Sequence, residues 1–247
     1  MTRIFLVIGL LALFLSLTPI LAADYIFDTV GSEIIFDGTL LKSGKTLHYT
    51  QKIQVLDPQI MQSDGFDIIH HTHLLSDYFT EEKVLFYKVE KDGIYLVATA
   101  DQLGGELSVY EEPSLELPLP PEKGKKWQRT RIEGGNLTEL NLEITDVDKE
   151  ITIGDKTEKT VVVKVSGTTV HQGKSSKTEK EIFFSKVGRV KQITKQYISD
   201  SEVAVSTFTL KNIIEPGEKS EKNQEPKAEE AAVKDSESTK TDNTKNP

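Results

Sequence analysis

The chain has 247 residues, with 39 acidic against 30 basic side chains, and it contains no cysteine. The lack of cysteine excludes disulfides, thiol catalysis, iron–sulfur clusters, cysteine-type zinc sites and a lipid anchored on a cysteine after a leader. The net charge of −9 argues against nucleic acid as a partner, because phosphate contacts require local positive charge.

Residues 1–23 have the pattern of a secretory signal peptide. A positive charge at Arg3 precedes an uncharged apolar run that ends with Pro19 and small residues at Ala22 and Ala23. These features are typical of a helical leader that is cleaved on export. The alternative is an uncleaved anchor, because an apolar run of this length spans a bilayer. After cleavage the protein would have no stable membrane anchor and would be periplasmic or secreted.

Residues 24–215 are expected to form a single all-β domain. Runs rich in valine, isoleucine, threonine and aromatic residues alternate with clusters of glycine, aspartate, asparagine or lysine, as strands alternate with turns. A single helical turn fits only at Thr80–Lys83. The predicted strands are Tyr25–Val30, Glu33–Leu41, Thr46–Leu56, Gly65–Leu75, Val84–Glu90, Gly93–Ala100, Gly105–Tyr110, Lys125–Ile132, Glu139–Val147, Thr160–Ser166, Thr168–His171, Lys180–Phe184, Arg189–Tyr197 and Val203–Ile213.

So many strands joined by short turns predict a large curled antiparallel sheet, a half-barrel or open barrel, with a sandwich as the alternative. The proline-rich stretch 113–121 is expected to be an extended connector between the strands of 24–112 and those of 122–215. Each proline removes a hydrogen-bond donor, so this stretch is excluded from the centre of a sheet. Gly167 predicts a bend, and Gly188 predicts a turn or bulge that redirects its strand.

The most distinctive group of polar side chains is the histidine cluster at 70–73. On a strand, His71 and His73 lie on the same face, because side chains alternate between the two faces. Two imidazoles placed this way can reach one zinc or copper ion. The alternative is that these histidines are half-buried strand residues or a titrating surface patch. The candidates for a third ligand are His48, Asp67 and Asp77.

A basic stripe with one aromatic residue is the second candidate site. Alternation from Lys125 places Trp127, Arg129 and Arg131 on a single strand face. Such a face can contact a phosphate headgroup or an anionic glycan, which makes these three residues candidate ligand-binding positions. A solvated strand face without a ligand is the alternative.

Residues 120–195 contain short motifs in a characteristic order. The two clearest motifs are Pro120-x-x-x-Gly124-x-x-Trp127 and the sequence Val187-Gly188-Arg189-Val190 after an aromatic run. In this order they resemble a widespread group of uncharacterised bacterial exported β-rich proteins. More distantly, they resemble the curled half-barrels of LolA- and LppX-like lipoprotein carriers. The resemblance implies a curved antiparallel sheet and a bacterial envelope location, with no established chemistry.

Residues 216–247 are expected to form a disordered tail. Val233 is their only large apolar side chain, so the segment cannot bury enough surface to offset the entropy lost on ordering. It is interpreted as a solvated spacer, with a tether toward the cell wall or a partner as the alternative.

Motifs of the common catalytic classes are missing from the sequence. It has no Gly-x-Ser-x-Gly elbow, no phosphate-binding glycine loop and no Ser-x-x-Lys pattern. We therefore expect a non-enzymatic envelope protein whose concave sheet binds a lipid, another hydrophobic ligand or an envelope component. The alternatives are a cell-surface structural or interaction module, and a metal-binding protein or hydrolase that uses His71 and His73. No cofactor is expected apart from a zinc or copper ion, and the oligomeric state is left open.

The leader provides a direct test. Cleavage after Ala22 or Ala23 would leave Ala23 or Asp24 as the first residue of the mature protein. N-terminal sequencing of exported material is expected to return one of these two residues, and a sequence that starts at Met1 or Thr2 would contradict cleavage.

Overall fold

The computed structural model describes residues 24–59, 65–133, 136–171, 174–198 and 203–218. The predicted signal peptide, and nearly all of the predicted tail, lie outside these residues. Within them, no helix is long and apolar enough to cross a membrane. The strands of the described chain are β1 (Glu33–Lys42), β2 (Lys45–Leu56), β3 (Ile68–Leu75), β4 (Thr80–Glu90), β5 (Gly93–Ala100), β6 (Ser108–Pro118), β7 (Lys126–Glu133), β8 (Asn136–Ile153), β9 (Lys156–His171), β10 (Lys174–Ser185), β11 (Gly188–Tyr197) and β12 (Val203–Ile214).

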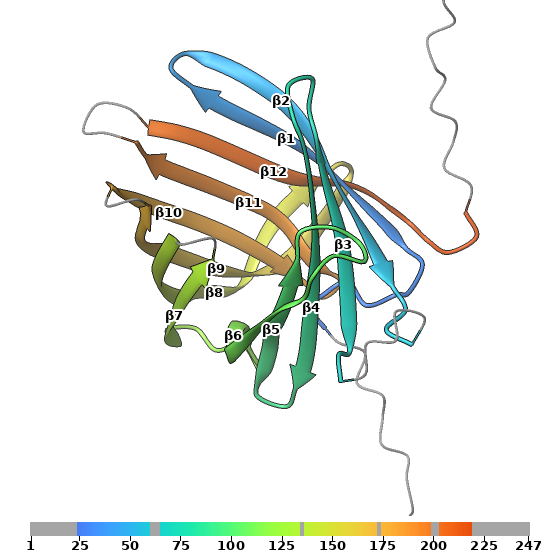
Figure 1. The fold of residues 1–247 in the computed structure, drawn as a ribbon. Helices are drawn as coiled ribbons and strands as arrows, with labels where there is room; N and C mark the ends of the chain where they lie inside the picture. The colour runs from blue at the N-terminus through green and yellow to red at the C-terminus, as the bar shows by residue number, and fades with distance from the viewer. Residues whose placement is uncertain (1–23, 60–64, 134–135, 172–173, 199–202, 219–247) are drawn as a thin grey trace, which may run out of the picture. The chain divides into compact units, whose positions relative to one another are not determined.

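All of these strands belong to one antiparallel sheet that is built outward from its centre (Figure 1). β1 pairs with β12 in the middle, β2 to β6 follow on one side, and β11 to β7 follow on the other. The two edge strands, β6 and β7, are therefore consecutive in the chain. The sheet curls until these edges approach one another, which gives a nearly closed, barrel-like sheet. The predicted all-β class and curled antiparallel sheet are confirmed.

Side chains join the two edges. Trp127 on β7 donates its indole N–H to the carbonyl oxygen of Leu115 on β6, over 2.9 Å. Arg129 on β7 forms an ion pair with Glu116 on β6. Edge strands expose unpaired backbone groups that favour association with other chains, so these contacts both close the sheet and protect its edges.

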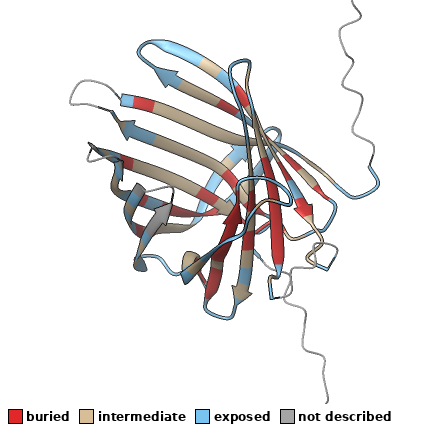
Figure 2. Ribbon diagram, in the orientation of Figure 1, coloured by how far each residue is buried: buried red, intermediate tan, exposed pale blue. Residues whose placement is uncertain are grey.

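The interior is packed mainly toward one end of the sheet. Its largest apolar cluster combines side chains of both halves, such as Ile34, Phe36 and Ile53 with Ile144 and Val163. Figure 2 shows buried residues gathered where β3, β4 and β5 lie, whereas the far ends of β1, β2 and β11 are intermediate or exposed. The packed end holds the fold together, and space remains beside it.

The predicted strand Tyr25–Val30 is wrong. This segment forms no strand, yet Ile26 and Phe27 are buried in the main apolar cluster. The backbone N–H of Tyr25 donates to the carbonyl of Lys186, in the turn between β10 and β11. The apolar pattern here reflects burial against the interior of the sheet rather than pairing with a neighbouring strand.

Three smaller expectations also change. Thr80–Lys83 is the start of β4 and not a helical turn, and Gly167 lies within β9 and not at a bend. The segment expected to be a connector, 113–121, is strand β6 as far as Pro118. Pro113 is accommodated because β6 is an edge strand, and because its pairing with β5 is interrupted between Val109 and Ser114.

The turn predicted at Gly188 is present, and it supplies a test of the packing. The pairing of β10 with β11 shifts register between Phe183 and Phe184, and Gly188 has φ +134°. A Cβ atom at Gly188 would lie 2.9 Å from the ring of Phe27.

Gly188→Ala is therefore expected to lower the free energy of unfolding by about 2 to 4 kcal/mol, since both backbone strain and overpacking contribute. Urea unfolding measures the change. Val187→Ala, in the same turn at an exposed position, is the matched control and is expected to change stability little. Equal effects of the two substitutions would contradict this account.

Candidate functional site

The barrel-like sheet encloses a cavity of about 370 Å³. Strands from both halves line it, and Glu116 and Arg129 from the two edges face it as well. Its volume lies within the range of pockets that hold small molecules. The concave face expected from the sequence is therefore not filled entirely by the protein's own side chains. The apolar part of the lining includes Ile53, Leu74, Leu85, Ile94, Leu96, Leu117, Ile182 and Phe184.

Arg189, at the start of β11, is the most unusual residue of this cavity. Its Nη1 donates to Oε1 of Gln192 over 3.1 Å, and its Nη2 donates to Oε1 of Gln51 over 2.9 Å. The guanidinium carbon lies 5.4 Å from the centre of the Phe36 ring. Among the described residues, no carboxylate forms an ion pair with Arg189.

Burial lowers the pKa of Arg189, although a guanidinium remains charged in proteins at any ordinary pH. Two neutral amides and an aromatic face offset only part of the free energy of taking this cation out of water. A group in a cleft whose pKa is shifted by desolvation and by a nearby charge is a candidate functional residue. Arg189 therefore presents to the cavity a positive charge on which Glu116 acts electrostatically but with which no described carboxylate forms an ion pair.

His70, on β3, lies on the same interior face. Its Nε2 is 2.6 Å from the carbonyl oxygen of Phe27, and because that oxygen can only accept, Nε2 carries the hydrogen. Burial, together with a smaller effect of the nearby Arg189 charge, lowers the pKa of His70 to about 4, although the hydrogen bond to Phe27 acts in the opposite direction. His70 is therefore neutral near pH 7, and it holds the segment around Phe27 against the sheet.

The residues of the predicted basic stripe separate into different roles. Trp127 and Arg129 share the interior face, as alternation predicts. Trp127 packs against the main apolar cluster, and Arg129 is already paired with Glu116. Arg131 is part of β7, but its side chain lies outside the described residues. Lys125 precedes the strand and is exposed.

The two predicted metal ligands lie on the opposite, outer face of β3. His71 and His73 are brought together with Glu82 of β4, and one ligand atom from each of the three lies within 4.8 Å of the others. The third ligands proposed from the sequence are not part of this group. Asp67 accepts the backbone N–H of Val89 instead, and His48 and Asp77 line a separate groove.

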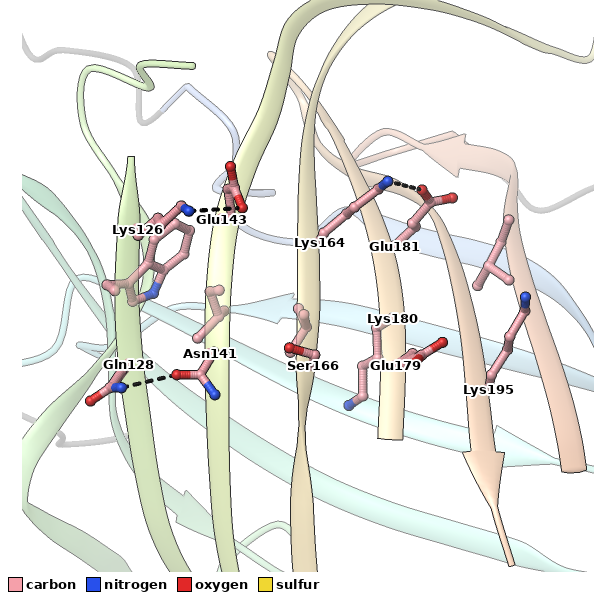
Figure 3. A pocket seen from close by; sticks show the side chains of 14 residues that line it. Lys126, Gln128, Asn141, Glu143, Lys164, Ser166, Glu179, Lys180, Glu181 and Lys195 are labelled. Carbon is pink, nitrogen blue, oxygen red and sulfur yellow. Dashed lines mark hydrogen bonds and ion pairs between the residues drawn. The ribbon is translucent and has the colours of Figure 1, made fainter. Parts of the chain in front are cut away.

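A larger groove of about 740 Å³ lies over the face of β7 to β11 that carries Lys126 (Figure 3). Two cross-strand rows of polar side chains cover it. In the first row Lys126 pairs with Glu143 and Lys164 with Glu181, at 3.6 and 3.7 Å. In the second row Gln128 donates to Asn141. Because these charges neutralise one another, the groove is a weaker candidate for a ligand site than the cavity around Arg189.

Several residues of these sites were not identified from the sequence. Glu82 was missed because the sequence of Thr80–Lys83 also fits a helical turn, which would not place Glu82 on a strand beside the histidines. Arg189 carried one local signal, a basic residue between Gly188 and Val190 in an otherwise apolar stretch. Its partner Gln51 is 138 residues away in the chain, so no local pattern indicates their contact.

The low pKa of His70 predicts a specific pH dependence of stability. The folded state binds a proton only near pH 4, whereas the unfolded chain binds it near the ordinary value of 6.5. As the pH falls below 6.5, the unfolded state gains the proton first, so stability is lost. Between pH 7 and pH 5 this amounts to about 2 kcal/mol.

His70→Gln keeps a donor for Phe27 but cannot titrate, so it is expected to lose about 2 kcal/mol less than the parent over this interval. Urea unfolding at the two pH values, with a chelator present, measures the difference. Parallel pH profiles for the two proteins would contradict the assignment.

No family model matches the chain, and no curated protein matches its sequence. Two solved structures resemble its fold. One is a candidate exported protein with a YmcC-like fold from Bacteroides fragilis, at 11% identity and a TM-score of 0.46, covering 77% of this chain and 99% of that one. The other is a candidate lipoprotein from Parabacteroides distasonis, at 12% identity and a TM-score of 0.47, covering 77% of this chain and 98% of that one.

Proposed function

We propose that this protein is an exported, non-enzymatic binding protein that holds an anionic amphiphile, such as a fatty acid, inside its barrel-like sheet. The pattern of the first 23 residues supports export to the periplasm or the cell exterior. The cavity and its chemistry support the binding role.

The observation that carries the proposal is the charge of Arg189, without an ion-pair partner among the described residues, in a cavity that it shares with apolar side chains. Glu116 acts on Arg189 electrostatically but is paired with Arg129, so a carboxylate or phosphate head would supply a direct ion-pair partner for Arg189. The planar guanidinium favours such groups, because it can donate two parallel hydrogen bonds to them. The acyl chain would lie against side chains such as Ile53, Leu96 and Ile182, where burial contributes about 25 cal/mol for each Å² removed from water.

The energetics of Arg189 favour a binding role over a structural one. A desolvated cation without an ion-pair partner destabilises the free protein, and replacing such a group with an apolar side chain of similar size is often neutral or stabilising. Residues that lower stability are typical of functional sites, where activity and stability conflict. A residue retained for stability alone would be expected to have a carboxylate partner, as Arg129 has in Glu116.

The polar groups that line the cavity support binding without catalysis. Glu116 is engaged by Arg129, and His70 donates its ring hydrogen to a backbone carbonyl. The hydroxyl of Thr72 donates to the carbonyl of Lys83. Each of these groups already has a structural partner, whereas a catalytic nucleophile requires a base placed to activate it.

The test compares dodecanoate with 1-dodecanol, which share a chain length and differ in the charge of the head. The parent protein, after lipid removal, is expected to bind dodecanoate more tightly. Arg189→Met is expected to weaken dodecanoate binding at least about tenfold, since a charge-assisted hydrogen-bonded pair is lost. Binding of dodecanol should change little. Isothermal titration calorimetry measures both ligands.

Lys191→Met, on the same strand but beside Phe183 on the other face, is the matched control and should leave binding unchanged. Arg189→Met should also unfold at an equal or higher urea concentration than the parent. The proposal fails if dodecanoate does not bind the parent, or if Arg189→Met leaves its binding unchanged. Native mass spectrometry of protein purified from its own host would then show whether another amphiphile is retained.

A further inference from the structure

The outer face of β3 carries a second group of side chains, whose member Glu82 on β4 also borders the cavity. Alternation along β3 sends His70 inward and His71 and His73 outward. Glu82 lies directly opposite His73 in the pairing of β3 with β4. Two imidazoles and one carboxylate therefore meet on adjacent strands, where the sheet fixes their spacing.

The distances within this group are those of a compact polar site. His71 Nε2 lies 2.7 Å from Glu82 Oε1, and the ring centres of His71 and His73 are 4.2 Å apart. One potential ligand atom from each of the three residues lies within 4.8 Å of the other two. Zinc bound by histidine and carboxylate has metal–ligand distances of about 2.0 to 2.2 Å, so a small movement of the carboxylate brings all three atoms to a shared ion.

The surroundings hold these groups in position. The backbone N–H of Leu103, in the β5–β6 connection, donates to Glu82 Oε1 over 2.8 Å. Figure 1 shows this connection crossing in front of β4 and β3. The apolar cluster that includes Ile69, Val84 and Ala98 packs beside them. Outer contacts that orient a ligand are characteristic of metal sites, and their loss weakens metal affinity.

The exposure of the three residues fits a site that is open on one side. His71 is buried, whereas His73 and Glu82 are partly exposed. Within the described chain, nothing forms a hydrogen bond with the ring nitrogens of His73, whose contacts are the His71 ring and the charge of Glu82. A nitrogen atom without a partner, close to a carboxylate, is available to a ligand.

We propose that His71, His73 and Glu82 bind a divalent transition-metal cation of the Zn²⁺ or Cu²⁺ class. Two imidazoles and one carboxylate form the ligand set that such ions accept, and the fourth position is left to solvent. The ion takes the place of the hydrogen now shared by His71 and Glu82. Lys52, the nearest basic residue by strand pairing, lies beside His73 but is engaged by Glu33.

The test titrates Zn²⁺ alone into the chelator-treated protein and follows it by calorimetry. One ion per chain is expected to bind. His73→Ala and Glu82→Gln are each expected to reduce the affinity at least about tenfold. Both substitutions leave the buried His71 in place. Binding of Co²⁺ should produce visible d–d absorption bands in the parent protein and not in these two variants.

His48→Ala, on neighbouring β2 and outside the group, is the matched control and should leave Zn²⁺ binding unchanged. Circular dichroism and urea unfolding establish that each variant is folded. The proposal is overturned if the parent binds no Zn²⁺, if the two substitutions leave its affinity unchanged, or if His48→Ala weakens it equally. Dodecanoate binding is expected to be unaffected by His73→Ala and His48→Ala, which lie outside the cavity lining, so these two variants test the metal site independently of the cavity.

Discussion

The pairing of β1 with β12 is the interaction on which the rest of the molecule depends. Each half of the chain is a meander of neighbouring strands, and only this pairing joins the first half to the second. It places β2 two strands away from β12 and so brings Gln51, Phe36 and Arg189 into one cluster on the interior face. The approach of β6 to β7 then closes the interior from the opposite side. A long-range pairing therefore builds the cavity, and short side-chain contacts close it.

Two different solutions to a buried charge occur in the same interior. Arg129 is neutralised by Glu116 and joins the two edges, so its charge contributes to the architecture. Arg189 is held by two neutral amides over an aromatic ring, so its position is fixed, while Glu116 acts on its charge without forming an ion pair. A rigid, oriented cation needs little reorganisation when an anion arrives, which is the property that raises affinity in preorganised sites. The contrast between the two arginines explains why only one of them is assigned to a ligand.

The fold class could be predicted because alternation of side chains is a local property of each strand. The same alternation predicts that His71 and His73 lie on one face. The elements that were missed depend on distant parts of the chain. Tyr25–Val30 has the apolar content of a strand, but the interior of the sheet uses it as packing. Glu82 becomes a neighbour of the histidines only when β4 begins at Thr80. The pairing of β10 with β11 shifts register near Phe184, which interrupts the simple alternation of side chains. The face on which Arg189 lies therefore depends on the turn and could not be read from the sequence pattern.

The two proposed sites share β3, and this has a structural consequence. His70 on its inner face holds the segment around Phe27, while His71 and His73 on its outer face meet Glu82. A one-residue change in the pairing of β3 would exchange the two faces, moving a neutral buried histidine outward and placing the pair in the apolar interior. That exchange would take Ile68 out of the main apolar cluster and leave imidazoles without partners in the interior, so burial strongly fixes the register. The same alternation that stabilises the sheet therefore places His70 toward the proposed anion-binding cavity and His71 and His73 toward the proposed metal site on the other face of the strand.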